Sequence, residues 1–409
     1  MLLLRRVLAS AVLATRAVAP AAVVIAAPLL VACGGGGKEA KEPKAKVEAK
    51  ASASQVLAEA RAAAKAGDTD KAHAKYKEAE KLDLQLAVVD EHVTFLLAHH
   101  LPDPAVEVAK AYYDAKPADT KGFLLYANAL IGAGDFATAA EVAGEVIGLE
   151  ENNAAGYEAR GRAYVMGGKF PEGIEDLRKA SELEPKNATY LVSLGSGLHS
   201  AGQTDEAGLI LRRAIEIEES ARALRLLGQV RRAQFETKEA VSWLIRATNA
   251  DKTDPEAWFQ LAVAQNDLGD NLEAENSAQK ATALDGSVAR YWYAYGEMLR
   301  FNKKEEEALA AYKKAAELKP PYPKAPGKIA KVLGDMGKYD EAEVYLTQMV
   351  QLDRNNPDLY FNLGKVYGAQ KKYKLAVEAV EKYLELAPKE DGLRKEAQED
   401  LKAYKRKAR

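Results

Sequence analysis

Apolar residues recur along this chain with a period of 34 residues. In the window that begins at Pro357, they hold places 4, 7, 8, 11, 20, 24 and 27, and a proline holds place 32. The same kinds of residue return when the window moves back 34 residues at a time, almost without a break to about Ala53. Such a period indicates a stacked array of units rather than one central core. The residues are Tyr360, Leu363, Gly364, Tyr367, Ala376, Val380, Tyr383 and Pro388.

Each window contains two apolar stripes whose members are three or four residues apart. This spacing places each stripe on one face of a helix, so a window predicts two amphipathic helices. A glycine or asparagine with charged residues separates the stripes, as in Gly269-Asp270, and is expected to end the first helix. In the window from Ala289 the stripes are Trp292, Tyr295, Gly296 and Leu299, then Ala308, Tyr312, Ala315 and Leu318.

Small residues occupy two of the recurring places. Because they lack bulk, the two helices of a window are expected to approach closely, while larger neighbours fill the space between windows. Place 8 is glycine in five windows, and place 20 is alanine in nine, seven of them from Ala139 onwards. These residues are Gly161, Gly195, Gly228, Gly296 and Gly364, and Ala139, Ala207, Ala240, Ala274, Ala308, Ala342 and Ala376.

With these residues the chain resembles the tetratricopeptide repeat family. The resemblance implies an all-α fold, a right-handed α-solenoid of about ten helix-turn-helix units. The array is expected to span residues 53–390, and residues 391–409 to form a capping helix with a basic tip. The windows begin at residues 53, 86, 120, 154, 188, 221, 255, 289, 323 and 357.

Two windows depart from the pattern. The window from Leu86 has His92-Val93 in place of Leu-Gly. The window from Pro323 has Pro326 where an aromatic residue is usual, so its first helix is expected to be short or to begin late.

The N-terminus predicts an export signal over residues 1–32, with Arg5-Arg6 before an apolar run. The run ends in Leu30-Val31-Ala32-Cys33-Gly34, which resembles a bacterial lipobox. Cys33 is the only cysteine of the chain, and its lipidation is the favoured interpretation; the other is an ordinary signal peptide with a cysteine near its cut site. The resemblance implies a lipid anchor on the periplasmic side of the outer membrane. Residues 33–52 are expected to form a flexible tether.

Neither the composition nor the sequence motifs indicate nucleic-acid binding, catalysis or a metal site. The net charge of −2 does not fit a nucleic-acid binder. No residue cluster supports catalysis, and no cofactor is expected. His92, His99 and His100 gather in one window, but without a cysteine or a third ligand they favour a loosely packed helix end over a metal site. We therefore expect no enzyme and no metal centre.

In the family that the chain resembles, the first helices line a concave groove that holds peptides or helices. The groove is expected to combine arginines with aromatic residues, which dominate binding hot spots. A ligand with acidic and apolar residues would complement it, unless the arginines pair with local acids instead. The candidate residues are Arg222, Arg225, Gln229, Arg232, Phe259, Asn266, Arg290, Tyr293, Arg300 and Phe301.

The favoured hypothesis is a membrane-anchored, periplasm-facing scaffold that binds protein partners along this groove to assemble or regulate an envelope complex. The alternative is an extracytoplasmic solenoid that binds carbohydrate or another ligand. The Lys and Asn clamp that chaperone-type members use for a C-terminal carboxylate is missing at the fifth place of the windows. A role as a cytosolic co-chaperone is therefore not expected.

Overall fold

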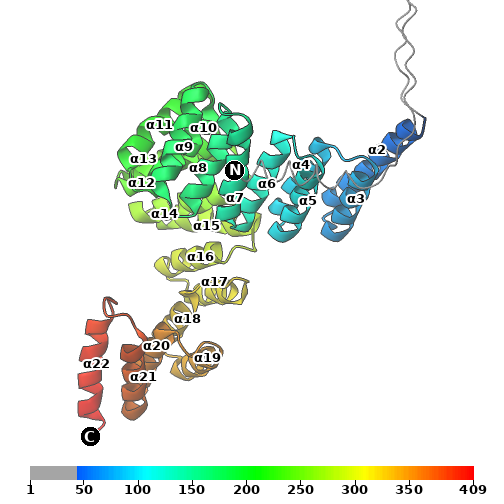
Figure 1. The fold of residues 1–409 in the computed structure, drawn as a ribbon. Helices are drawn as coiled ribbons and strands as arrows, with labels where there is room; N and C mark the ends of the chain where they lie inside the picture. Colours follow the sequence, from blue (N-terminus) through cyan, green and yellow to red (C-terminus); the bar gives the residue numbers. More distant parts are fainter. Residues whose placement is uncertain (1–43) are drawn as a thin grey trace, which may run out of the picture. The chain divides into compact units, whose positions relative to one another are not determined.

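The computed structural model describes residues 44–409, and this part of the chain is all-helical. Twenty-one helices, α2–α22, follow one another in stacked pairs (Figure 1). Residues 53–409 form one compact unit. The all-helical solenoid predicted from the sequence is confirmed.

The first helices of the pairs are α2 (Lys44–Lys65), α4 (Leu86–Ala98), α6 (Thr120–Ala133), α8 (Ala154–Met166), α10 (Ala188–Ser200), α12 (Ala221–Ala233), α14 (Pro255–Leu268), α16 (Ala289–Phe301), α18 (Ala325–Asp335) and α20 (Pro357–Ala369). The second helices are α3 (Thr69–Leu82), α5 (Pro102–Ala115), α7 (Phe136–Leu149), α9 (Phe170–Leu183), α11 (Thr204–Ile217), α13 (Thr237–Ala250), α15 (Asn271–Leu284), α17 (Glu305–Glu317), α19 (Tyr339–Leu352) and α21 (Tyr373–Leu386). The last helix is α22 (Arg394–Lys407).

Helices α2 and α18 differ from the other first helices at their N-terminal ends. Helix α2 begins at Lys44, so residues 44–52, which the sequence assigned to a flexible tether, are its first turns. Lysine, glutamate and alanine fill this segment and are strong helix formers. Helix α18 begins late, at Ala325, and has 11 residues, as Pro326 predicted. Pro326 lies in the first turn, where its missing N–H removes no helical hydrogen bond.

The close approach of paired helices depends on the glycine at place 8. A Cβ atom on Gly228 would lie 2.6 Å from Leu244, and one on Gly296 would lie 2.7 Å from the ring of Tyr312. Leu244 and Tyr312 are fully buried. The glycine of the first helix therefore leaves the space that the bulky residue at place 24 of the second helix fills.

A left-handed residue occupies place 15 of all ten windows, in the turn between paired helices. Six of these residues are glycine, the type that adopts positive φ without steric cost. The other four are His100, Phe235, Lys303 and Lys371, with φ near 60°. Backbone hydrogen bonds hold each turn in the same way: the amide of Gly202 donates to His199 O at 3.0 Å, and that of Phe235 to Arg232 O at 3.0 Å. The turn thus keeps its shape whichever residue stands there.

Helix α22 packs against the last pair of the array. Its residues Ala397 and Tyr404 join a buried apolar cluster with Phe361, Val380 and Tyr383. Lys405 of α22 pairs with Glu381 of α21 at 2.7 Å. The final apolar surface of the array is covered in this way.

No helix among residues 44–409 is long and apolar enough to cross a bilayer. The predicted signal segment 1–32, Cys33 and the tether up to residue 43 lie outside the described residues.

Replacing Ala308 by tryptophan should overpack one helix pair. Ala308 is fully buried at place 20, so the larger ring has no space without moving α16 from α17. We expect the free energy of unfolding to fall by about 1–3 kcal/mol. Chemical denaturation of Ala308→Trp beside Ala310→Trp, an exposed alanine of the same helix, measures this. Equal stability of the two variants would contradict the packing argument.

Candidate functional site

A hollow between α14 and α16 collects five of the ten predicted groove residues. It has a volume of about 400 Å³ and receives further side chains from the segment that follows α17. The predicted residues that line it are Phe259, Asn266, Arg290, Tyr293 and Phe301. Val263, Ala294, Glu297, Met298 and Tyr322 complete its wall. We call it the aromatic hollow.

Ring contacts set the walls of the aromatic hollow. The rings of Tyr293 and Tyr322 lie 4.3 Å apart, and those of Phe259 and Tyr291 lie 5.2 Å apart. Arg290 extends over the Phe259 ring, with its guanidinium carbon 5.5 Å from the ring centroid. Burial raises the pKa of Tyr293 further above neutral pH, and its protonated hydroxyl can donate a hydrogen bond. The hollow therefore fits an apolar side chain of a ligand that also carries a polar group next to that side chain.

Most groove arginines have an acidic partner inside the protein. Arg225 donates to Asp254 at 3.1 Å, and Arg232 donates to Asp267 at 2.8 Å. Arg290 pairs with Glu256, and Arg300 lies 3.9 Å from Glu297. The interpretation that the arginines pair with local acids therefore describes these four residues.

Arg222 is different. It makes no hydrogen bond or ion pair within residues 44–409, and it is exposed to solvent. Although its side chain reaches solvent, partial desolvation, then the charges of Arg162 and Arg225, lower the pKa of Arg222; Glu158 acts in the opposite sense. Because its charge lies near other arginines, Arg222 is a place where an anionic group of a ligand would be favoured.

A second hollow lies beside α12 and has a volume of about 670 Å³. The predicted residues Gln229 and Arg232 line it, and α14 contributes Gln260 and Asp267. We call it the amide hollow. Since α14 also lines the aromatic hollow, the two are neighbours on the same helix. His199, Ala233, Phe235 and Thr237 complete the amide hollow.

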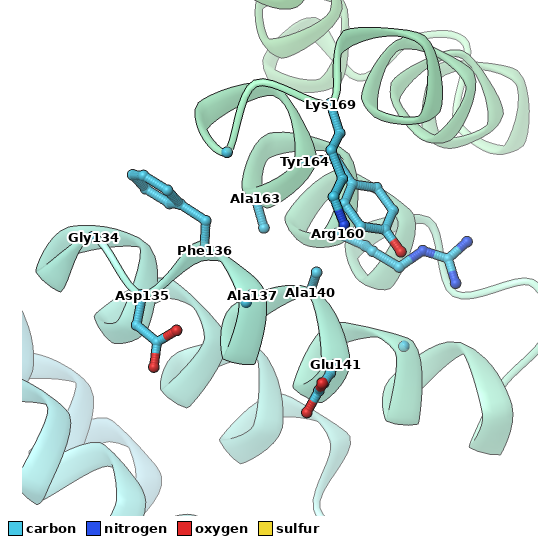
Figure 2. Close-up of a pocket in the computed structure, with 12 residues that line it drawn as sticks. Gly134, Asp135, Phe136, Ala137, Ala140, Glu141, Arg160, Ala163, Tyr164 and Lys169 are labelled. Carbon is cyan, nitrogen blue, oxygen red and sulfur yellow. The ribbon is translucent and has the colours of Figure 1, made fainter.

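A third hollow, of about 660 Å³, lies between α7 and α8 (Figure 2). Small residues of α7, among them Ala137 and Gly144, form one wall, where other windows carry longer side chains. On the other wall Arg160 makes a bidentate pair with Asp176, at 2.7 and 2.8 Å. Asp176 thus compensates the charge of Arg160, and the hollow exists because the residues of α7 that line it are small.

The histidines form a contact that the sequence did not reveal. Nδ1 of His73 lies 2.8 Å from Nε2 of fully buried His92, whose Nδ1 lies 2.7 Å from Glu80. His73 belongs to the preceding window, so the histidine spacing within one window could not reveal this contact. His99 instead contacts the carbonyl of Phe95, and His100 faces Asp285 at 3.4 Å.

The three histidines of the window from Leu86 therefore do not converge. Among residues 44–409 no group of three potential ligands is placed to hold a metal ion.

Two models of the tetratricopeptide repeat match the sequence. One matches residues 333–400, and the other matches residues 124–180, 158–220 and 259–323. The chain belongs to the tetratricopeptide repeat family. The match over residues 259–323 contains every residue that lines the aromatic hollow.

Two curated relatives match about half of this tetratricopeptide repeat chain. Protein NPGR1 of Arabidopsis thaliana is 26% identical over 228 residues, which are 54% of this chain and 31% of that protein. Protein O-mannosyl-transferase TMTC1 of Homo sapiens is 25% identical over 217 residues, 52% of this chain and 24% of that protein. The chain thus spans less than a third of either relative.

Among solved structures, the APC/C hetero-tetramer Cut9-Hcn1 aligns with this tetratricopeptide repeat chain with a TM-score of 0.51 at 15% identity. The alignment covers 86% of this chain and 76% of that chain. At this identity the likeness establishes the fold.

The contact between α3 and α4, which joins the first two tetratricopeptide pairs, should lose stability in mild acid. Burial, then the charges of His92 and Lys77, lower the pKa of His73 below 6.5, against the opposing carboxylates of Glu80 and Glu107. The unfolded chain therefore takes up a proton near pH 6.5 before the folded chain does. Stability is full above that pH and falls as the pH is lowered toward the folded pKa.

Thermal unfolding followed between pH 7.5 and pH 5 measures this effect. The loss of melting temperature should be smaller for His73→Asn than for the unaltered chain, whereas His99→Asn, at an exposed histidine that contacts a backbone carbonyl, should behave like the unaltered chain. An identical loss in all three would contradict the role of His73.

Proposed function

We propose that this chain is a non-catalytic scaffold that binds protein partners along the first helices of its repeats and gathers them at the bacterial envelope. The observation that carries the proposal is the aromatic hollow, in which five predicted groove residues meet. Its open apolar wall beside compensated charges is the arrangement of a protein-binding surface, where apolar anchors lie inside a polar rim.

The chemistry of the groove suggests what a partner segment offers. An apolar or aromatic side chain would bury in the aromatic hollow, and such burial contributes about 1.5–3 kcal/mol. A carboxylate elsewhere on the segment would meet the exposed charge of Arg222. The ion pairs of Arg225 and Arg232 already compensate those charges, so these residues set the shape of the groove more than its attraction for an acid.

The proposed attachment to the membrane rests on the sequence around Cys33. Small residues precede this single cysteine, and a thioether-linked diacylglycerol with an amide-linked chain would supply a firm anchor. Gly34 follows the cysteine, which favours the outer membrane of a two-membrane bacterium by analogy with other lipoproteins. The array would then face the periplasm and hold envelope proteins together.

Removing the hollow's exposed ring together with the exposed arginine should abolish partner capture. The variant Phe301→Ala with Arg222→Glu changes two exposed side chains and no buried one, so helical content should stay the same. Proteins crosslinked to the tagged chain in intact envelopes would be identified for this variant and for Arg212→Glu, an exposed arginine of α11. We expect the double variant to lose the crosslinked partner proteins and Arg212→Glu to retain them. If the folded double variant still captured all of them, the groove would not be the binding surface.

Replacing the proposed lipid acceptor should release the protein from the membrane. Cys33→Ser leaves no thiol for a thioether, so we expect no incorporation of labelled fatty acid and a shift from the membrane to the soluble fraction. Density-gradient separation of inner and outer membranes then locates the unaltered chain. A Cys33→Ser chain that still carries label and stays on the membrane would contradict the anchor.

A further inference from the structure

Phe235 is the most exposed large apolar residue among those described. Its side chain is 92% exposed, in the turn between α12 and α13. At place 15 of that window it also holds a left-handed backbone conformation, with φ of 62°. A bulky apolar residue is unfavourable there for two reasons, because positive φ is disfavoured for every residue with a Cβ and water surrounds the ring.

The fold does not require phenylalanine at this place. Six windows have glycine there, and the other non-glycine residues are His100, Lys303 and Lys371, all of which carry polar or charged groups. The turn is held by its backbone, since Phe235 N donates to Arg232 O at 3.0 Å and Glu236 N donates to Arg231 O at 2.9 Å. An unfavourable residue that stabilises nothing in the fold points to a role outside it.

The polar groups beside the ring already have partners. Gln234 donates to Asp205 at 2.7 Å, Arg231 donates to Glu236 at 2.6 Å, and Arg232 donates to Asp267 at 2.8 Å. These contacts hold the turn rigid before any ligand arrives. A partner would therefore meet a fixed aromatic ring at a small cost in conformational entropy.

The amide hollow next to Phe235 offers hydrogen bonds without net charge. The carboxamide of Gln229 presents a donor and an acceptor, and that of Gln260, whose Nε2 donates to Glu256 at 2.8 Å, keeps its oxygen as an acceptor; a peptide backbone needs both kinds of group. Nδ1 of His199 is buried without a hydrogen-bond partner. The remaining charged residues of the hollow, Arg232 and Asp267, form an ion pair with each other.

Helix α14 connects this hollow to the aromatic hollow. Its residues Phe259 and Asn266 line the aromatic hollow, and their neighbours Gln260 and Asp267 line the amide hollow. A single extended segment can therefore cross α14 and occupy both. This continuity favours a peptide over a glycan, because the aromatic hollow fits an apolar side chain and the amide hollow fits a backbone.

We propose that Phe235 is an anchoring residue for a partner peptide. The peptide backbone lies in the amide hollow, and one of its apolar side chains covers the Phe235 ring. This inference rests on the proposed binding of protein segments along the first helices, and it extends the binding surface from the groove to the turn at its edge.

Short random peptides displayed on phage and selected against the full chain supply the probe. The dissociation constant of a selected, fluorescein-labelled peptide is then measured by anisotropy for the unaltered chain and for four variants. Phe235→Gly should weaken binding about tenfold or more, as for a hot-spot residue. Phe235→Trp should restore binding, and Lys303→Gly, the matched change in another left-handed turn, should leave it unchanged. Phe301→Ala, in the aromatic hollow, should weaken binding as well.

Melting temperatures show whether a variant loses peptide binding because it is less stably folded. Glycine removes the steric cost of positive φ, so Phe235→Gly should melt no lower than the unaltered chain, like Lys303→Gly. Binding that is lost in a folded Phe235→Gly chain and restored by Phe235→Trp supports the anchor.

Two results would overturn the inference in distinguishable ways. If Phe301→Ala weakens binding but Phe235→Gly does not, the anchor is wrong and the proposed function stands. If no peptide is selected, or binding ignores Phe301→Ala, the groove proposal fails and this inference fails with it. Retention of glycans but no peptides on arrays would likewise contradict both.

Discussion

The contact between the glycine of one helix and the bulky residue of its partner is the constraint on which the rest of the structure depends. Gly228 against Leu244 and Gly296 against Tyr312 bring the helix axes together with no space for a Cβ atom. Because this contact recurs in many windows, paired helices meet in a similar way along the array. The side chains of the first helices that are not used in packing then gather in hollows between neighbouring repeats, as Phe259 and Tyr293 do.

The electrostatics of the groove follow from the same repetition. First helices of neighbouring repeats lie side by side, so Arg225 of α12 meets Asp254 at the start of α14, and Arg290 of α16 meets Glu256 of α14. These pairs are partly exposed, and each contributes little to stability. They leave the groove with little net charge, so apolar contacts would contribute most of the affinity for a partner. Arg222 is the exception, because it forms no ion pair among residues 44–409.

The sequence predicted the fold well because the period is local. Spacings of three and four define each helix, and most first helices begin at the residue that opens a window, as at Ala221 and Ala289. The late start of α18 could also be predicted, from Pro326. The N-terminal extension of α2 was missed because a charged, alanine-rich segment has the composition of both a tether and a helix.

The site was harder to predict because it depends on contacts between windows. Five of the predicted groove residues lie together in the aromatic hollow, but the acids that pair with Arg225 and Arg232 lie about one repeat further along the chain. The contact between His73 and His92 likewise joins two windows. Phe235 was overlooked because place 15 is not a groove place, although a phenylalanine where most windows have glycine was visible in the sequence.

The ten left-handed turns suggest how a repeat protein gains new recognition. Their hydrogen bonds hold the backbone whichever residue stands at place 15, so an exchange there leaves the helices and their packing untouched. Each turn can therefore vary on its own, and an array of ten offers ten separate opportunities for a new contact. Diversification of such a chain would begin at its corners, at the local cost of positive φ for a residue with a Cβ, before it altered the helices themselves.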